Sequence, residues 1–174
     1  MYGYPNRVSP PTEGVDSLLG KLVIKQLHHV AEHLEICAQW NFDEWGKDFG
    51  FTYNSALERI RQDAFSLGGE AAVVAFWDKA PIGTGLLERT GAEQHPELSP
   101  WLSGLYVEPG YRGKGIANEV VKVIEALAID AGYADIYLHT STAETLYARL
   151  GWQTIAHFER EVTGHHAVMR KALI

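Results

Sequence analysis

One stretch of the sequence decides the fold: Leu105-Tyr106-Val107-Glu108-Pro109-Gly110-Tyr111-Arg112-Gly113-Lys114-Gly115-Ile116-Ala117. It begins as an apolar strand, passes through a short turn and becomes a basic loop interrupted by glycines. Beyond it, apolar residues recur at helical spacing with charged residues between them, as in a helix with one buried face: Val120, Val121, Ile124, Leu127 and Ala128. The stretch therefore predicts a strand, a loop and a helix in direct succession.

The loop has the chemistry of a phosphate-binding site. The first backbone N–H groups of a helix have no partner within it, and the helix dipole adds roughly half a positive charge there, so an anion is favoured. Gly113 and Gly115 lack a Cβ, which lets the backbone take positive φ and approach a pyrophosphate closely. Arg112 and Lys114 add full charges, and Ala117 keeps the first turn narrow. The order of residues fits neither a Walker loop nor the three-glycine dinucleotide loop.

Two segments of the chain match the motifs of one family. Residues 112–117, Arg-Gly-Lys-Gly-Ile-Ala, resemble an Arg/Gln-x-x-Gly-x-Gly/Ala loop. Residues 142–152, Thr-Ala-Glu-Thr-Leu-Tyr-Ala-Arg-Leu-Gly-Trp, resemble an Ala-x-x-Leu-Tyr-x-x-x-Gly-Phe segment. Both motifs are those of the GNAT superfamily of N-acetyltransferases, in which the loop grips the pyrophosphate of coenzyme A. The resemblance covers roughly residues 21–172, because the expected helices and strands also follow the family's order.

The hydrophobic pattern of the whole chain gives the expected elements. Strands are predicted over 21–27, 70–77, 82–88, 101–107, 134–140, 152–161 and 165–172. Helices are predicted over 29–45, from 55 to 67, after the loop as far as 131, and over 142–150. The fold class is α/β of the α+β type, GNAT-like: a mixed, mostly antiparallel sheet of about seven strands with helices on both faces, in the order β-α-α-β-β-β-α-β-α-β-β.

Three local signals fix the boundaries of these elements. Gly46 is expected to end the first helix. The segment Ser55-Ala56-Leu57-Glu58 has the form of a capping box and is expected to start the second helix. The polar link Asp78-Lys79-Ala80-Pro81 is short enough to join two strands as a hairpin.

The resemblance implies acetyl-CoA as co-substrate and no metal. In GNAT folds the strand before the loop and the strand after its helix splay apart, and the pantetheine arm lies between them, bonded to the first strand's backbone. Splaying leaves backbone N–H and C=O groups that need partners, which the amides of pantetheine can supply. Many relatives carry an asparagine where this chain has Thr140, so one amide donor is absent. The implied cofactor-binding residues are Leu105, Tyr106, Val107, Arg112, Gly113, Lys114, Gly115, Ile116, Ala117 and Thr140.

Tyr147 is the catalytic acid that the resemblance implies. The leaving group in acetyl transfer is a thiolate, whose conjugate acid has a pKa of about 8.5. A phenol, with a pKa of about 10, can donate a proton or a hydrogen bond to this thiolate as its charge develops. Packing of the short helix against the sheet is the alternative role for Tyr147.

The sequence does not single out one residue as the general base. Some protein acetyltransferases place a glutamate where this chain has Trp101. Glu88, at the end of a predicted strand near the gap between the splayed strands, is the candidate base, acting directly or through water. His95 and Glu97, in the following loop, are the next candidates after Glu88. The alternative for each of the three is a solvated loop residue.

Aromatic and acidic residues near the first two helices mark the expected amine site. Trp40, Glu44 and Trp45 combine aromatic faces with an acid, which suits a cationic amine, although aromatic residues at a helix end are also common in a core. His29 and His33 are four residues apart on a predicted helix. They lack the glutamate of a zincin and a third ligand, so no metal is expected.

Composition limits the classes of protein to which the chain can belong. Its 174 residues, 46% of them hydrophobic, suit one core, so we expect a tail or flap over 1–19 and one GNAT-like N-acetyltransferase domain over 20–174. A formal net charge of −7 disfavours nucleic acid. The sequence has no apolar run of about 18 residues and no second cysteine beside Cys37, and from its first residues we expect no signal peptide. We expect a cytoplasmic monomer or homodimer without a membrane or nucleic-acid partner.

The predicted function is an N-acetyltransferase that moves an acetyl group from acetyl-CoA to a primary amine. Ser103, Ser141 and Cys37 show no nucleophile signature, which favours direct attack by the amine over a covalent acyl-enzyme. The expected acceptor is a small-molecule amine. The alternatives are a protein or peptide N-terminal acetyltransferase and a noncatalytic acyl-CoA-binding sensor. Tyr147 argues against the sensor, because a sensor needs no proton donor beside the sulfur.

Overall fold

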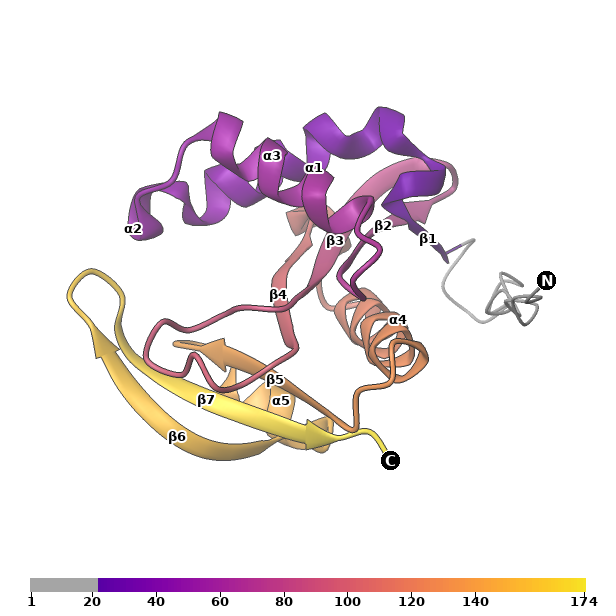
Figure 1. The fold of residues 1–174 in the computed structure, drawn as a ribbon. Coiled ribbons are helices and arrows are strands. Elements are labelled where there is room, and N and C mark those ends of the chain that lie inside the picture. The colour runs from indigo at the N-terminus through magenta and orange to yellow at the C-terminus, as the bar shows by residue number, and fades with distance from the viewer. Residues whose placement is uncertain (1–21) are drawn as a thin grey trace.

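Seven strands form a single sheet in the order β1-β2-β3-β4-β5-β7-β6 in the computed structural model, which describes residues 22–174 (Figure 1). They are β1 (Leu22–Gln26), β2 (Ala71–Trp77), β3 (Ala80–Glu88), β4 (Trp101–Val107), β5 (Asp135–Thr140), β6 (Gln153–Arg160) and β7 (Gly164–Ala172). Every neighbouring pair is antiparallel except β4 and β5, which run parallel. The mixed, mostly antiparallel sheet predicted from the sequence is confirmed. The tail predicted over 1–19 lies outside the described residues.

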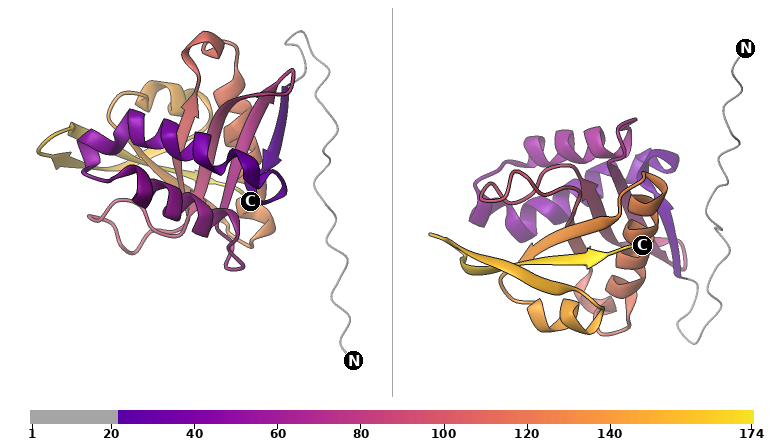
Figure 2. Two further views of the ribbon diagram at one scale, coloured as in Figure 1. Left: turned by 90° about the horizontal axis from the view of Figure 1, so that it is seen from above. Right: turned by 60° about the horizontal axis from the view of Figure 1, so that its bottom comes forward.

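Helices cover both faces of this sheet (Figure 2). The α-helices are α1 (Leu34–Asn41), α2 (Lys47–Phe49), α3 (Tyr53–Ala64), α4 (Ile116–Asp130) and α5 (Glu144–Arg149). Shorter turns are the 3₁₀ segments Leu27–His29, Ala31–His33 and Pro109–Tyr111 and a π-helix over Phe42–Gly46. Helices α1 and α3 share one hydrophobic core with the sheet, and α4 and α5 share another on the opposite face.

Strand β2 shows why the central strands are apolar along their whole length. Val74 and Phe76 belong to the core beneath α1 and α3, whereas Val73 and Ala75 belong to the core beneath α4. Successive side chains of a strand point to opposite faces, so a strand covered on both sides must be apolar at every position. The sequence of β2, Ala-Ala-Val-Val-Ala-Phe-Trp, meets this requirement.

Strands β4 and β5 touch only at one end. Their single register pair is Trp101 with Tyr137, and the backbone N–H of Tyr137 donates to the carbonyl of Pro100 over 2.9 Å. Beyond this point β5 continues against β7 as far as Thr140, while β4 continues against β3 as far as Val107. The edge of β4 that faces β5 is therefore left without a strand partner over most of its length (Figure 1). This is the parting of strands that the family resemblance implied.

A β-bulge lies in β4 beside the parting. The pairing of β3 with β4 shifts between Thr84 and Leu86, which leaves one extra residue in β4 around Gly104. Gly104 has a φ of 55°, and a Cβ there would lie 2.7 Å from Asn41 Oδ1 and 2.9 Å from Leu86 Cδ1. A bulge of this kind bends the strand and increases its twist. The bulge thus turns the second half of β4 away from β5.

The predicted end of the first helix at Gly46 is wrong. The helical path continues through Gly46 into α2 and ends at Gly50, whose φ of 72° is left-handed. Gly46 is buried, and a Cβ there would lie 2.5 Å from the ring of Phe42 and 3.2 Å from the carbonyl of Phe51. The glycine is needed for close approach rather than for termination. The start of the helix also differs, because residues 27–33 form 3₁₀ turns.

The capping box predicted at Ser55 is displaced by three residues. Helix α3 begins after Thr52, whose Oγ1 accepts from the backbone N–H of Ser55 over 3.2 Å. The hydroxyl of Ser55 in turn accepts from the backbone N–H of Thr52 over 3.0 Å. The reciprocal bonds are those of a capping box, with serine in the place of the usual Glu or Gln.

The hairpin predicted between β2 and β3 is confirmed, with a tighter turn than expected. Asp78 and Lys79 alone form the turn, with φ values of 46° and 74°. Two successive residues of positive φ match the twist of the flanking strands. Ala80 and Pro81 already belong to β3 and pair with Trp77 and Phe76.

Replacement of Gly104 tests the bulge. Gly104→Ala would place a Cβ against Asn41 and Leu86 at a left-handed φ, so we expect the free energy of unfolding to fall by about 2 kcal/mol or more. Gly110→Ala is the control, because a Cβ there meets nothing within 4 Å. Urea unfolding followed by tryptophan fluorescence gives both values, and equal stability of the two variants would contradict a strained bulge.

Candidate active site

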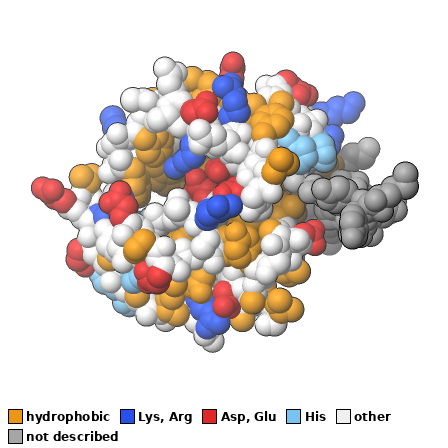
Figure 3. Space-filling view, in the orientation of Figure 1, with side chains coloured by type: hydrophobic (Ala, Val, Ile, Leu, Met, Phe, Trp, Pro, Cys, Tyr) orange, Lys and Arg blue, Asp and Glu red, His pale blue; other side chains and the backbone are white. Residues whose placement is uncertain are grey.

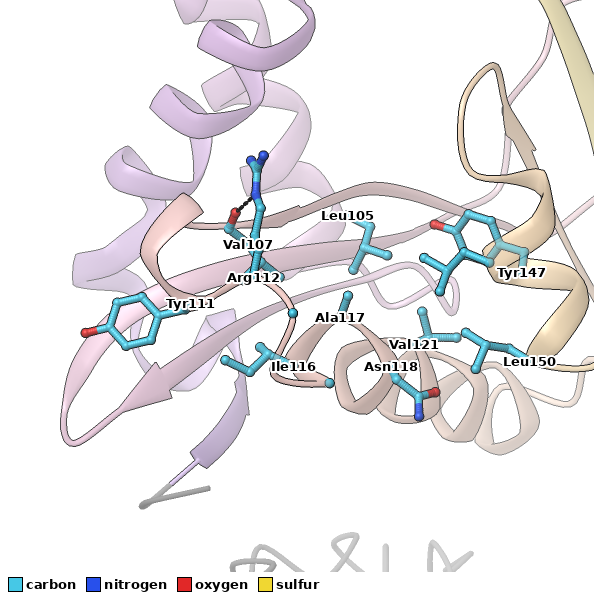
Figure 4. Close-up of a pocket in the computed structure, with 13 residues that line it drawn as sticks. Leu105, Val107, Tyr111, Arg112, Ile116, Ala117, Asn118, Val121, Tyr147 and Leu150 are labelled. Atoms are coloured by element: carbon cyan, nitrogen blue, oxygen red, sulfur yellow. Dashed lines mark hydrogen bonds between the residues drawn. The ribbon is translucent and has the colours of Figure 1, made fainter. Parts of the chain in front are cut away.

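A cavity of about 300 Å³ lies between β4, the loop after it, α4 and α5 (Figure 4). It brings together residues far apart in the sequence. Among the predicted site residues, those that line it are Leu105, Val107, Arg112, Gly113, Gly115, Ile116, Ala117 and Tyr147. The lining also includes residues that the sequence analysis did not propose: Tyr111, Asn118, Val121, Leu146 and Leu150. Their signal was present in the helical spacing of α4 and α5, which places Val121 one turn after Ala117 and Leu150 one turn after Leu146.

The glycine loop places the N-terminus of α4 at this cavity. Gly113 and Gly115 have φ values of 75° and 79°, so both occupy the left-handed region expected of them. Gly115 is the N-cap of α4 and has no side chain with which to cap it. The first N–H groups of α4 are therefore not satisfied by a capping side chain, and an anion placed there would meet both these donors and the helix dipole.

Arg112 is held away from the first turn of α4. Its Nε donates to the carbonyl of Val107 over 2.7 Å, as Figure 4 shows. The guanidinium lies 5.5 Å from the ring centroid of Tyr106, and its Nη2 is 4.0 Å from a carboxylate oxygen of Glu44. In this position Arg112 ties the end of β4 to the segment after α1. It also brings a positive charge close to Glu44, one of the residues expected at the amine site.

Lys114 is exposed at the tip of the loop. Its Nζ lies 5.5 Å from the ring centroid of Trp77 and 5.3 Å from that of Tyr111. The two rings come from the end of β2 and from the turn after β4, and their centroids are 6.0 Å apart. Cation–π contacts of this kind place the ammonium beside the loop without using its hydrogen-bond donors.

Tyr147 packs the short helix against the sheet and also lines the cavity. Its ring is buried and packs edge-to-face on Trp152, with centroids 5.9 Å apart. Its hydroxyl points into the cavity toward Leu105 (Figure 4). Burial raises the pKa of Tyr147 to about 12, so the phenol keeps its proton at neutral pH. A protonated hydroxyl in the cavity is a hydrogen-bond donor.

Thr140 does not line the cavity. Its Oγ1 accepts from the backbone N–H groups of Thr142 and Ala143, over 3.3 and 3.0 Å. These bonds organise the entry into α5, the helix that carries Tyr147. The placement suits a residue that positions Tyr147 through the helix start.

Glu88 is held by partners at the end of β3. Its side chain is 12% exposed, it accepts a hydrogen bond from the hydroxyl of Ser103, and its Oε1 is 3.4 Å from Nε of Arg59. The alternative of a solvated loop residue therefore does not describe Glu88. His95 and Glu97 lie in the loop before β4 and pair with each other over 3.1 Å.

Trp40 belongs to the core between α1 and β4. It is buried, stacks on Tyr106 with ring centroids 5.4 Å apart, and its Nε1 donates to Glu108 over 2.6 Å. Of the three residues expected at an amine site, only Glu44 is exposed, and Trp45 is half-buried. The aromatic platform proposed from Trp40 is thus largely used by packing.

Charge is mixed on the face of the molecule that Figure 3 shows, with Lys and Arg side chains scattered among Asp and Glu. Within residues 22–174, no helix combines the length and the apolar character needed to cross a membrane. In the same part of the chain, no three His, Cys, Asp or Glu side chains gather as a metal-ion site requires.

Comparison with known proteins matches this architecture to one family. The sequence model of the acetyltransferase (GNAT) family matches residues 22–152. No curated protein sequence matches the chain. An aminoglycoside 6'-N-acetyltransferase complexed with coenzyme A aligns with a TM-score of 0.68 and 16% identity, over 87% of this chain and 97% of its own.

Two further solved structures give the same result. The aminoglycoside 6'-N-acetyltransferase from Enterococcus faecium aligns with a TM-score of 0.68 and 15% identity, over 87% of this chain and 97% of its own. A spermidine N-acetyltransferase chimera from Vibrio cholerae and hSSAT aligns with a TM-score of 0.66 and 17% identity, over 87% and 95%. At such identities the likeness is one of fold.

The contact between Trp40 and Glu108 can be tested for its part in fixing α1 to the end of β4. Trp40→Phe removes the indole donor and leaves a carboxylate short of a partner, so we expect the free energy of unfolding to fall by about 1–3 kcal/mol. Chemical unfolding of this variant, of Glu108→Gln and of the double variant forms a double-mutant cycle. Strictly additive losses would show that the hydrogen bond contributes nothing.

Proposed function

Since the chain belongs to the acetyltransferase (GNAT) family and is an acyltransferase, we propose that it moves the acetyl group of acetyl-CoA to a primary amine by direct nucleophilic attack. One observation carries this proposal. The unpaired edge of β4, the uncapped start of α4 and the hydroxyl of Tyr147 all border the same cavity. An acyl thioester with an amide-rich arm and a pyrophosphate needs these three features.

The residues that line the cavity, with Tyr106 and Lys114 beside it, fit coenzyme A in three parts. The backbone of Leu105, Tyr106 and Val107 lies on the unpaired edge of β4 and, apart from the Val107 carbonyl that accepts from Arg112, offers N–H and C=O groups to the amides of the pantetheine arm. The glycine loop offers the first N–H groups of α4 to the pyrophosphate. Lys114, exposed at the loop, adds positive charge for the phosphates.

The chemistry assigned to the chain is acid catalysis and charge stabilisation. As the amine nitrogen bonds to the acetyl carbon, a backbone N–H near Val107 stabilises the developing oxyanion. The carbon–sulfur bond then breaks, and Tyr147 donates its proton to the departing thiolate. Glu88 accepts the proton that the nitrogen loses. The products are the acetylated amine and free coenzyme A.

We propose a small-molecule amine as the acceptor. Aminoglycoside and spermidine N-acetyltransferases are among the structural neighbours, which supports this class without selecting one compound. Release of thiol from acetyl-CoA, screened against small amines and peptide N-termini, tests the proposal. Peptides alone as acceptors would favour the N-terminal acetyltransferase, and tight cofactor binding without any acceptor would favour the sensor. The expected cytoplasmic location stays a prediction.

A thiol-release assay suits this chain because its single cysteine is protected. Cys37 is fully buried, and burial raises the pKa of its thiol to about 12. A buried neutral thiol reacts poorly with a disulfide reagent. The colour that develops in the assay therefore reports coenzyme A rather than the enzyme.

Tyr147→Phe tests the acid. The variant keeps the ring that packs on Trp152 and loses only the hydroxyl, so we expect kcat to fall by about a hundredfold while the Kd for acetyl-CoA changes less than threefold. Tyr133→Phe, on a half-buried tyrosine outside the cavity lining, is the control. Full activity in Tyr147→Phe would remove the acid role.

Lys114→Ala tests the phosphate contact. Loss of the ammonium at the loop should weaken acetyl-CoA binding by about three- to tenfold, measured by calorimetry at low salt. Lys122→Ala is the matched control, because Lys122 lies on α4 and pairs with Glu119 over 2.8 Å. An unchanged Kd in Lys114→Ala would count against this part of the site.

A further inference from the structure

We propose that Asp63 and Glu88 act as one unit that accepts the proton of the amine substrate, with Asp63 as a positioning residue that shares a proton with Glu88. This inference rests on the proposed function and adds to it a residue that the sequence analysis did not identify. It also predicts a pH dependence that a single carboxylate would not give.

Glu88 lies beside the point where β4 leaves β5. It is the register partner of Trp101, the one residue of β4 that pairs with β5. The hydroxyl of Ser103, two residues further along β4, donates to Glu88. Leu105, two residues further on, lines the cavity, and the bulge around Gly104 places its side chain on the face opposite to that of Ser103. The carboxylate is thus held at the parting of the strands.

The carboxylate and the cofactor cavity lie on opposite sides of β4. Directly paired residues of antiparallel strands, and residues two apart on one strand, share a face, so Glu88, Trp101 and Ser103 point the same way. Leu102 points the other way, into the core beneath α4. An amine that approaches from the side of α1 and α3 would therefore meet Glu88, while the thioester enters from the side of α4 and α5.

Asp63 supplies the second carboxyl from α3. Asp63 is only 9% exposed, and its Oδ2 is buried without a hydrogen-bond partner. Arg59, one turn earlier on α3, has its Nε 3.4 Å from Oε1 of Glu88, and residues four apart on a helix are neighbours, so Asp63 faces the same carboxylate. Two carboxylates so close repel each other, and a buried charge without a donor is costly, so one of the two keeps a proton. A protonated Asp63 removes the repulsion between the two charges and leaves no buried charge on its own side chain, and its proton can be donated to Glu88.

The charges around the pair support this assignment. Burial first, and then the charge of Glu88, raise the pKa of Asp63 to about 8. Arg59, on the same helix, lowers it, and Glu70, at the start of β2, raises it further. Glu70 itself is paired with Arg89 over 3.0 Å. At neutral pH the pair thus carries one proton and one negative charge, which Arg59 balances.

The proposed step conserves atoms and charge. The nitrogen lone pair forms the carbon–nitrogen bond, the carbon–sulfur electrons leave with sulfur, and sulfur takes the proton of Tyr147. The proton lost by nitrogen passes to Glu88, so the carboxyl pair gains one proton. The pair later releases one proton to solvent. Tyr147 then takes one proton from solvent. Above pH 8, where Asp63 has lost its own proton, the pair is a stronger base for this transfer.

Asp63→Asn tests the shared proton through the pH profile of kcat. Asparagine keeps the shape and can still donate to Glu88, but it has no proton to lose. With one saturating amine we expect wild-type kcat to rise through an ionisation near pH 8 and the variant to lack that rise. The variant should be about tenfold slower than wild type at pH 9 and within threefold at pH 6. Glu58→Gln, on an exposed acid of the same helix, should follow the wild-type profile.

Thermal unfolding gives a readout independent of activity. An aspartate whose folded pKa, about 8, exceeds its unfolded pKa, about 4, binds more protons when folded, so its contribution to stability falls as pH rises between these values. Asparagine has no such loss. The Tm of Asp63→Asn minus that of wild type should therefore increase from pH 5 to pH 9, whereas the same difference for Glu58→Gln should stay constant.

The outcomes separate the two ideas. Superimposable kcat profiles in an active enzyme, or a Tm difference for Asp63→Asn that does not change with pH, would overturn the shared proton and leave the acetyltransferase proposal intact. Absence of thiol release with every amine in the wild-type protein would overturn the proposed function and the proton-accepting role together. A lost pH step together with a widening Tm difference would support the pair.

Discussion

The departure of β4 from β5 is the constraint on which the rest of the structure depends. After the single pair of Trp101 with Tyr137, one edge of β4 has no strand partner, although the strand runs through the middle of the sheet. Backbone N–H and C=O groups inside a protein need hydrogen bonds, so such an edge is costly unless something fills it. A ligand that carries its own amides relieves that cost. In the proposed complex, unpaired backbone groups of β4 would therefore contribute to binding together with side chains.

Two features of the chain shape the unpaired edge of β4. The bulge at Gly104 bends β4, and the glycine is required because a Cβ would meet Asn41 and Leu86. At the far end of the strand, Arg112 holds the carbonyl of Val107. Leu105, on this edge, packs against the core beneath α4, and a close-packed core has low compressibility. The opening is therefore built into the packing of the fold.

Much of the fold was predictable because it follows from short-range rules. The limits of β4 were predicted to the residue, and the start of α4 after Gly115 follows from the loop itself. The errors fell where a short-range signal has two meanings. Gly46 permits close packing on Phe42 instead of ending a helix, and Ser55 is the last of the four residues of a capping box instead of the first. Only the surrounding packing decides between these meanings.

The sequence by itself determined the order of the elements, the glycine loop and its helix, and the presence of Tyr147 on a short helix, because these depend on neighbours within a few residues. The tertiary structure decided where long side chains point and which distant groups meet. It directed Arg112 toward β4 and brought Asp63, on the apolar face of α3, against Glu88 from another element. Such contacts join residues far apart along the chain, and their protonation depends on burial, which only the packed fold creates.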